Sequence, residues 1–291
     1  MKITSLKTPS GKTFEFVDGV EPETPRLIMA SFGPWNTGKS RFGVTGPNTV
    51  GIIPVDRKTR RTVEKTIEEL KSRGIKKKIL MPKTDFIRQI NPMSQATMTD
   101  EKTKEFYQQH VQEINESAWA MHASPEVKII VIDLFEQYVK NVRYACYGRE
   151  KHVITIKGKQ YQDYKEADQK VIDFINSLSS KHLLLTCKER AEYVNDVRTN
   201  KLTWQAGGFN WLGNHTNLIL EHEQNSKWVG EKDDPETARY PDDEERNWRF
   251  GLTVSSSQDR LDLMGQRVLV DDQITFGNLA TLLYPEHEWE D

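Results

Sequence analysis

The chain has 291 residues and a formal net charge of −2, and 36% of its residues are hydrophobic and 29% charged. This length suits one large α/β domain that buries most of the surface its unfolded form exposes. The start lacks an apolar stretch of signal-peptide length, and the most apolar run, Ile129 to Phe135, is interrupted by Asp133. Cys146 and Cys187 are the only cysteines, which excludes a disulfide framework and a Cys-rich zinc module. We therefore expect a cytoplasmic protein without a membrane span.

The near-neutral net charge hides segments of opposite sign. Residues 57–83 carry eleven basic residues against three acids, and residues 140–165 carry seven against two. Residues 231–246 carry eight acids against three basic residues. A basic stretch can meet a polyanion, and it can also be a solvated helix face or loop, so charge alone leaves both interpretations open.

Local patterns predict strands that alternate with helices after an N-terminal hairpin within Leu6–Val17. We expect strands in five short apolar segments: 26–30, 50–55, 78–81, 129–132 and 182–186. We expect one helix to start at Lys39 and others to cover residues 60–73, 100–124, 134–146 and 164–178. Asp100 is the expected N-cap of the longest of these helices. The alternation predicts a parallel, doubly wound sheet.

The pattern changes after Lys188. A polar loop is expected up to Gly208, and residues 148–163 before it are expected to form a loop or hairpin. Antiparallel strands are then expected in residues 217–223, 227–229 and 248–255. A short helix that begins near Thr275 closes the chain.

One motif is specific, and it lies between a predicted strand and a predicted helix. It matches G-x-x-x-x-G-K-[ST] and consists of Gly33, Pro34, Trp35, Asn36, Thr37, Gly38, Lys39 and Ser40. Its glycines let the backbone curl so that N–H groups point at phosphates, and the following helix N-terminus favours an anion. Lys39 would bridge the β and γ phosphates, and the Ser40 hydroxyl would bind Mg²⁺. The motif therefore predicts an ATP site with Mg²⁺.

A second Mg²⁺ residue is expected at the end of a neighbouring strand, where a carboxylate holds the ion through water. Asp133 fits, because it ends the apolar segment Lys128–Ile132. The same residue could serve only as the N-cap of the next helix. Together with the phosphate loop, the metal role is the better interpretation.

These segments resemble the RecA-like P-loop ATPases, and more closely the compact phage-type members linked to single-strand annealing and recombination. The resemblance spans residues 26–285. It rests on the loop GPWNTGKS, the strand KIIVID, the polar-ended strand His182–Lys188 and the tail from Asp262 to Phe276. It implies an α/β, RecA-like doubly wound, mainly parallel sheet. The expected parts are a hairpin in 1–25, a P-loop NTPase core in 26–210, and antiparallel strands with a closing helix of the same domain in 211–291.

The resemblance also implies catalytic residues. A catalytic carboxylate is expected after the strand that follows the phosphate-loop helix, and Asp56 occupies that place although the family usually has a glutamate there. Glu136, one helical turn beyond Asp133, is the second candidate, with a plain helix-surface residue as its alternative. Thr186 is expected to sense the γ phosphate, or else to be a buried threonine bonded to backbone. Lys39 completes the catalytic set.

In RecA-like folds, the loops after the Asp-bearing strand–helix unit and after the sensor strand line the DNA path. Here these are residues 148–163 and 188–208, and we expect both at the nucleotide's edge of the sheet. Cations with interleaved aromatics suit a phosphate backbone and stacked bases, although solvated loops are the alternative. The candidate DNA-binding residues are Lys157, Lys159, Tyr161, Lys188, Arg190, Arg198, Lys201 and Trp204. Lys188 or Arg190 could instead reach the γ phosphate of a neighbouring copy.

The sequence thus predicts an ATP-hydrolysing protein that acts on single-stranded DNA in phage-type recombination or replication. The expected partners are single-stranded DNA, further copies of the chain in a ring or filament, and a single-strand-binding protein. Two alternatives remain open. One is a nucleotide-gated DNA-binding or assembly module without efficient hydrolysis, and the other is a small-molecule or nucleoside kinase with a lid in residues 188–210.

Overall fold

The computed structural model describes most of the chain. It covers residues 2–7, 13–18, 25–34, 37–47, 49–55, 57–82, 98–148, 153–156, 159–162, 164–178, 180–194, 197–205, 212–225, 248–287 and 289. Within these ranges, no helix is both long enough and apolar enough to cross a membrane.

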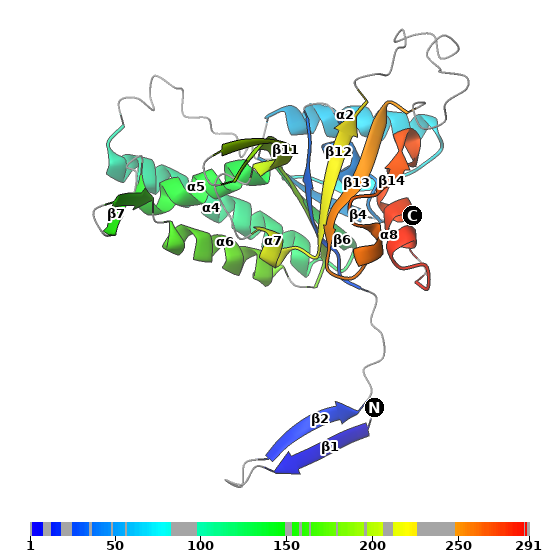
Figure 1. Ribbon diagram of the computed structural model, residues 1–291, viewed down its shortest axis with the longest axis horizontal. Coiled ribbons are helices and arrows are strands. Elements are labelled where there is room, and N and C mark those ends of the chain that lie inside the picture. Colours follow the sequence, from blue (N-terminus) through cyan, green and yellow to red (C-terminus); the bar gives the residue numbers. More distant parts are fainter. Residues whose placement is uncertain are drawn as a thin grey trace.

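An eight-stranded sheet forms the centre of the molecule, in the order β14-β13-β12-β3-β9-β6-β4-β5 (Figure 1). Its strands are β3 Ile28–Phe32, β4 Thr49–Pro54, β5 Lys78–Leu80, β6 Val127–Asp133, β9 His182–Thr186, β12 Leu218–Gln224, β13 Phe250–Ser257 and β14 Arg267–Val270. The strands from β12 to β5 pair in parallel, whereas β13 and β14 are added by antiparallel pairing. The α/β fold class with a mainly parallel sheet and a C-terminal antiparallel extension, as expected from the sequence, is confirmed.

Two details of the C-terminal strands differ from expectation. β12 is antiparallel only to β13, since it pairs in parallel with β3 and so extends the parallel part of the sheet. β14 has no counterpart among the expected strands because its four residues carry too short a pattern. The strand expected at 227–229 lies outside the described residues.

Helices cover both faces of the sheet, which explains why its central strands are apolar on both sides. The helices are α1 Lys39–Val44, α2 Arg57–Ser72, α4 Asp100–Ala123, α5 Phe135–Tyr147, α6 Lys165–Ser177, α7 Leu212–His215 and α8 Phe276–Leu283. α4, α5 and α6 bury one face, and α1, α2 and α8 bury the other. The expected N-cap of α4 is wrong by one residue: Thr99 accepts the Lys102 N–H at 3.4 Å, and Asp100 is the first helical residue.

Three antiparallel hairpins pair outside the large sheet. They are β1 Lys2–Lys7 with β2 Thr13–Asp18, β7 Val153–Ile156 with β8 Lys159–Gln162, and β10 Lys188–Val194 with β11 Val197–Gln205. The last of these corrects the polar loop expected after Lys188. Its alternation is weak because few of its residues are apolar, so period-two patterning did not reveal it.

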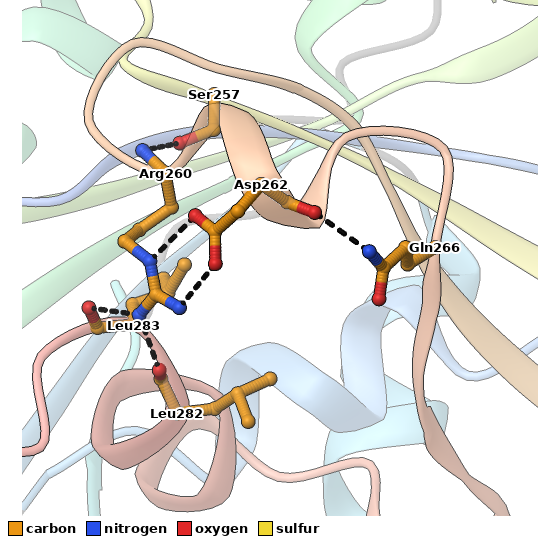
Figure 2. Close-up of polar contacts among 6 residues, drawn as sticks. All are labelled: Ser257, Arg260, Asp262, Gln266, Leu282 and Leu283. Atoms are coloured by element: carbon orange, nitrogen blue, oxygen red, sulfur yellow. Dashed lines mark hydrogen bonds and ion pairs between the residues drawn. The ribbon is translucent and has the colours of Figure 1, made fainter.

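Arg260 ties the segment after β13 to the end of α8 (Figure 2). Its guanidinium donates to both Asp262 carboxylate oxygens at 2.9 and 2.7 Å, and to the carbonyls of Leu282 and Leu283 at 2.8 and 2.9 Å. Carbonyls in the last turn of a helix lack intrahelical partners, and a cation there also complements the helix dipole. Arg260 thus holds the closing helix to the β13 edge.

Candidate nucleotide-binding site

The phosphate loop connects β3 to α1 at the carboxyl edge of the parallel strands. Gly33 has φ 144° and Gly38 has φ 89°, and Gly38 is the N-cap of α1. Both values lie in the region that favours glycine, so the two motif glycines are required by backbone conformation. Lys39 and Ser40 form the first turn of α1. Trp35 and Asn36 lie outside the residues that the structure describes.

Lys39 folds back over the loop. Its Nζ donates to the carbonyl oxygens of Gly33 at 2.8 Å and Pro34 at 2.6 Å. Burial lowers the pKa of Lys39, and the nearby carboxylates of Asp133, Glu189 and Glu136 act in the opposite direction. The ammonium therefore lies where the loop concentrates positive charge for an anion.

Asp133 lies at the centre of a cluster of hydroxyl groups. Its Oδ2 accepts from Ser40 Oγ at 2.8 Å and from Thr59 Oγ1 at 2.7 Å, and its Oδ1 accepts from Thr186 Oγ1. Asp133 is only 3% exposed, and the three donors come from α1, α2 and the end of β9. The sheet order explains this convergence, because β9 lies between β3 and β6 and brings Thr186 beside Asp133.

The cluster brings together three of the residues expected from the sequence, namely Ser40, Asp133 and Thr186. Thr59 was missed, since it lies 74 residues from Asp133 and nothing local distinguishes it from other helix threonines. A hydroxyl and a carboxylate are hard oxygen ligands of the kind Mg²⁺ prefers. The donor set therefore fits the ion implied by the sequence, which Ser40 and Asp133 would hold.

Glu136 lies in the first turn of α5, three residues after Asp133, and is 1% exposed. Its carboxylate forms an ion pair with Lys188, whose Nζ lies 3.5 Å from Oε1. Burial raises the pKa of Glu136. A buried carboxyl whose pKa is raised beside Lys39 has the character of a proton acceptor. Asp56, the other expected candidate, lies outside the described residues.

Replacing Glu136 with glutamine should slow ATP turnover by about 100-fold, as expected for loss of a general base, while ATP affinity stays near the wild-type value.

The same substitution should stabilise the fold at pH 8. Burial raises the folded-state pKa of Glu136 from 4.5, so the folded protein keeps this carboxyl protonated at a higher pH than the unfolded chain does. The wild type therefore loses stability as the pH rises from 4.5 through the folded-state pKa, and glutamine avoids this loss.

Thermal unfolding at pH 8 and at pH 4 checks the second part, because the advantage of Glu136→Gln should shrink when the wild-type carboxyl is protonated. Asp56→Asn is the comparison variant for turnover. Slow turnover in Asp56→Asn together with normal turnover in Glu136→Gln would identify Asp56 as the base.

His222 on β12 lies against the phosphate loop, and no local pattern in the sequence predicts this position. It is fully buried, and its Nδ1 lies 3.2 Å from the carbonyl oxygen of Thr37. Burial, aided by the charge of Lys39, lowers the pKa of His222 to about 3, so the ring is neutral at physiological pH. A Cβ built on Gly33 would lie 2.1 Å from the His222 carbonyl oxygen, so strand and loop touch through their backbones.

The candidate DNA-binding residues divide between two hairpins that lie apart (Figure 1). β10 follows Cys187 directly, so the β10–β11 hairpin leaves from the nucleotide edge and carries Lys188, Arg190, Arg198, Lys201 and Trp204. The β7–β8 hairpin, with Lys159 and Tyr161, instead follows the C-terminal end of α5. α5 is 13 residues long and starts at the nucleotide edge, so its other end lies away from that edge. The expectation that both segments lie at the nucleotide edge is therefore wrong for β7–β8. Lys157 lies outside the described residues.

Comparisons with known proteins assign no family to this chain. No protein-family model matches the sequence, and no curated protein matches it. Among solved structures, the chain is similar to the "unique ATP synthase subunit NeqB from Nanoarcheaum equitans", with 11% sequence identity and a TM-score of 0.36. The match covers 68% of this chain and 46% of that one, so this chain spans about half the length of that subunit. The function proposed below therefore rests on the geometry of the chain's own residues.

Proposed function

We propose that this chain binds ATP with Mg²⁺, hydrolyses it, and uses this cycle on single-stranded DNA in recombination or replication in the cytoplasm. The observation that carries the nucleotide part is the Asp133 cluster. A buried carboxylate accepts from Ser40, Thr59 and Thr186, next to a loop closed by Lys39. Such a set is suited to a nucleotide phosphate chain and its divalent ion.

Each side chain has a role in this proposal. Lys39 would leave the loop carbonyls of Gly33 and Pro34 to contact the β and γ phosphates, and Ser40 and Asp133 would hold the ion. Mg²⁺ supplies charge neutralisation of the phosphate oxygens when bound. Thr186, released from Asp133, would donate to the γ phosphate, and Glu136 would take a proton from the attacking water.

The DNA part of the proposal is supported by the connection between the site and the β10–β11 hairpin. Thr186 contacts Asp133, and two residues later Lys188 lies 3.5 Å from Glu136, at the first position of β10. Changes at Asp133 or Glu136 would therefore act directly on the base of the hairpin. This is a route by which nucleotide state could alter DNA contact.

Substituting Trp204 with alanine should weaken single-stranded DNA binding by about 1–3 kcal/mol if a base stacks on the indole. Replacing both Lys157 and Lys159 with alanine should make the affinity for single-stranded DNA depend less steeply on salt concentration, because fewer counterions are released on binding. Tyr161→Ala should cost a similar amount to Trp204→Ala, but only the Trp204 loss should depend on nucleotide, since β7–β8 lies away from the site. Fluorescence anisotropy with an oligonucleotide at several salt concentrations measures all three effects.

The control for these variants is charge reversal of Arg61 and Lys65, which are exposed on α2. Should reversal there abolish DNA binding while Trp204→Ala binds normally, the DNA path does not follow the β10–β11 hairpin.

ATP turnover with and without single-stranded DNA tests the function as a whole. DNA-stimulated phosphate release supports the proposal, and ATP binding without turnover would favour the nucleotide-gated assembly module. Transfer of phosphate to a small molecule would favour the kinase. Sedimentation with nucleotide and DNA would test the ring or filament, and addition of a single-strand-binding protein would test that partner.

A further inference from the structure

In the hydrogen bond between His222 and Thr37, the histidine must be the donor. A carbonyl oxygen accepts and never donates, so the Nδ1 of His222, 3.2 Å from Thr37 O, must carry the ring proton. The neutral ring then has an unprotonated Nε2. That atom is buried and has no hydrogen-bond partner among the described residues.

The peptide that His222 contacts is the one that joins Thr37 to Gly38. In a trans peptide the C=O and the N–H lie on opposite edges of one plane. Holding the Thr37 carbonyl toward β12 therefore directs the Gly38 N–H away from β12. Gly38 is the N-cap of α1, where unpaired N–H groups converge on an anion.

Packing alone does not account for a histidine at this position. The ring is fully buried against Phe42, at 5.8 Å between centroids in an edge-to-face arrangement. An apolar side chain would fill the same space without leaving a buried nitrogen unpaired, which destabilises a fold. An apolar residue would, however, lose the contact between Nδ1 and the Thr37 carbonyl oxygen.

We propose that His222 is a positioning residue for the phosphate loop, which turns the Thr37–Gly38 peptide so that its amide faces the phosphates of the bound nucleotide. This inference rests on the proposed nucleotide-binding function. A residue of β12, which lies outside the motif, would thus orient the loop amide before the nucleotide binds.

The test compares His222→Leu, His222→Asn and the wild type for ADP and ATP affinity by calorimetry, and for thermal unfolding. Leucine keeps the volume and removes the donor, so nucleotide affinity should fall by about five- to tenfold while the unfolding temperature stays equal or rises. Asparagine places an amide donor near the position of Nδ1 and should recover most of the affinity.

His182 supplies a control, because it is a half-buried histidine at the start of β9 whose Nδ1 accepts from Leu27 N at 3.1 Å. His182→Leu should lower the unfolding temperature and leave nucleotide affinity unchanged. A further measurement needs no variant: long-range ¹H–¹⁵N correlation in the wild type should show His222 protonated at Nδ1.

Several outcomes would overturn the inference. They are equal affinity in His222→Leu and the wild type, a loss of affinity that asparagine does not recover, or an Nε2-protonated ring. A wild type that binds neither ADP nor ATP would instead overturn the proposed function. If His222→Leu does not fold, the tautomer of the wild type and the affinity of His222→Asn decide the matter.

Discussion

Replacing Lys39 with alanine should reduce ATP affinity by about 100-fold or more, which corresponds to roughly 3 kcal/mol. Lys39 is the cation that closes the loop, with its Nζ on the carbonyls of Gly33 and Pro34. Charge-assisted hydrogen bonds to phosphate are among the strongest polar contacts that a protein makes. Calorimetry with Mg²⁺ and ATP measures the loss.

The fold should survive this substitution. Lys39 donates to two loop carbonyls, and each such hydrogen bond contributes only about 1 kcal/mol of net stability. Lys71→Ala is a matched control, because Lys71 is exposed in the last turn of α2 and should leave affinity unchanged. Wild-type affinity in a folded Lys39→Ala protein would end the phosphate-loop interpretation.

Replacing Asp133 with asparagine should remove the part of ATP affinity that depends on Mg²⁺ and slow turnover by about 100-fold or more. The carboxylate charge that holds the ion is lost, although the side chain keeps its shape. The variant should also be destabilised by about 1–3 kcal/mol. Asparagine has one acceptor oxygen, whereas Asp133 uses Oδ2 for Ser40 and Thr59 and Oδ1 for Thr186, so an NH₂ group would face a hydroxyl donor.

Nucleotide affinity is measured with Mg²⁺ and with EDTA, and stability by chemical unfolding. Asp173→Asn on α6 is the control, since Asp173 is an exposed carboxylate that accepts from Gln169 at 2.8 Å within one helix. If Asp133→Asn shows the wild-type difference between Mg²⁺ and EDTA, the ion is held elsewhere and the metal assignment to Asp133 is wrong.

The sequence alone determined the parts of this protein whose physics is local. The strand–loop–helix unit around Lys39 follows from two glycines with positive φ and from the N-terminus of α1, both of which are short-range features. The apolar segments of β6 and β9 predicted buried parallel strands because a sheet covered on both faces needs no alternation. The sequence likewise predicted Asp133 and Thr186 as polar residues at the ends of such strands.

Only the tertiary structure decided which residues meet at the site. Thr59 reaches Asp133, and His222 reaches Thr37 across 185 residues, through the order in which strands pair. Strand order is set by the packing of whole layers, so no local pattern predicts it. The same reason separates the two candidate DNA hairpins, because the length of α5 carries β7–β8 away from the edge where β10 begins. Local chemistry therefore specified the phosphate loop, and long-range packing supplied the partners that hold it.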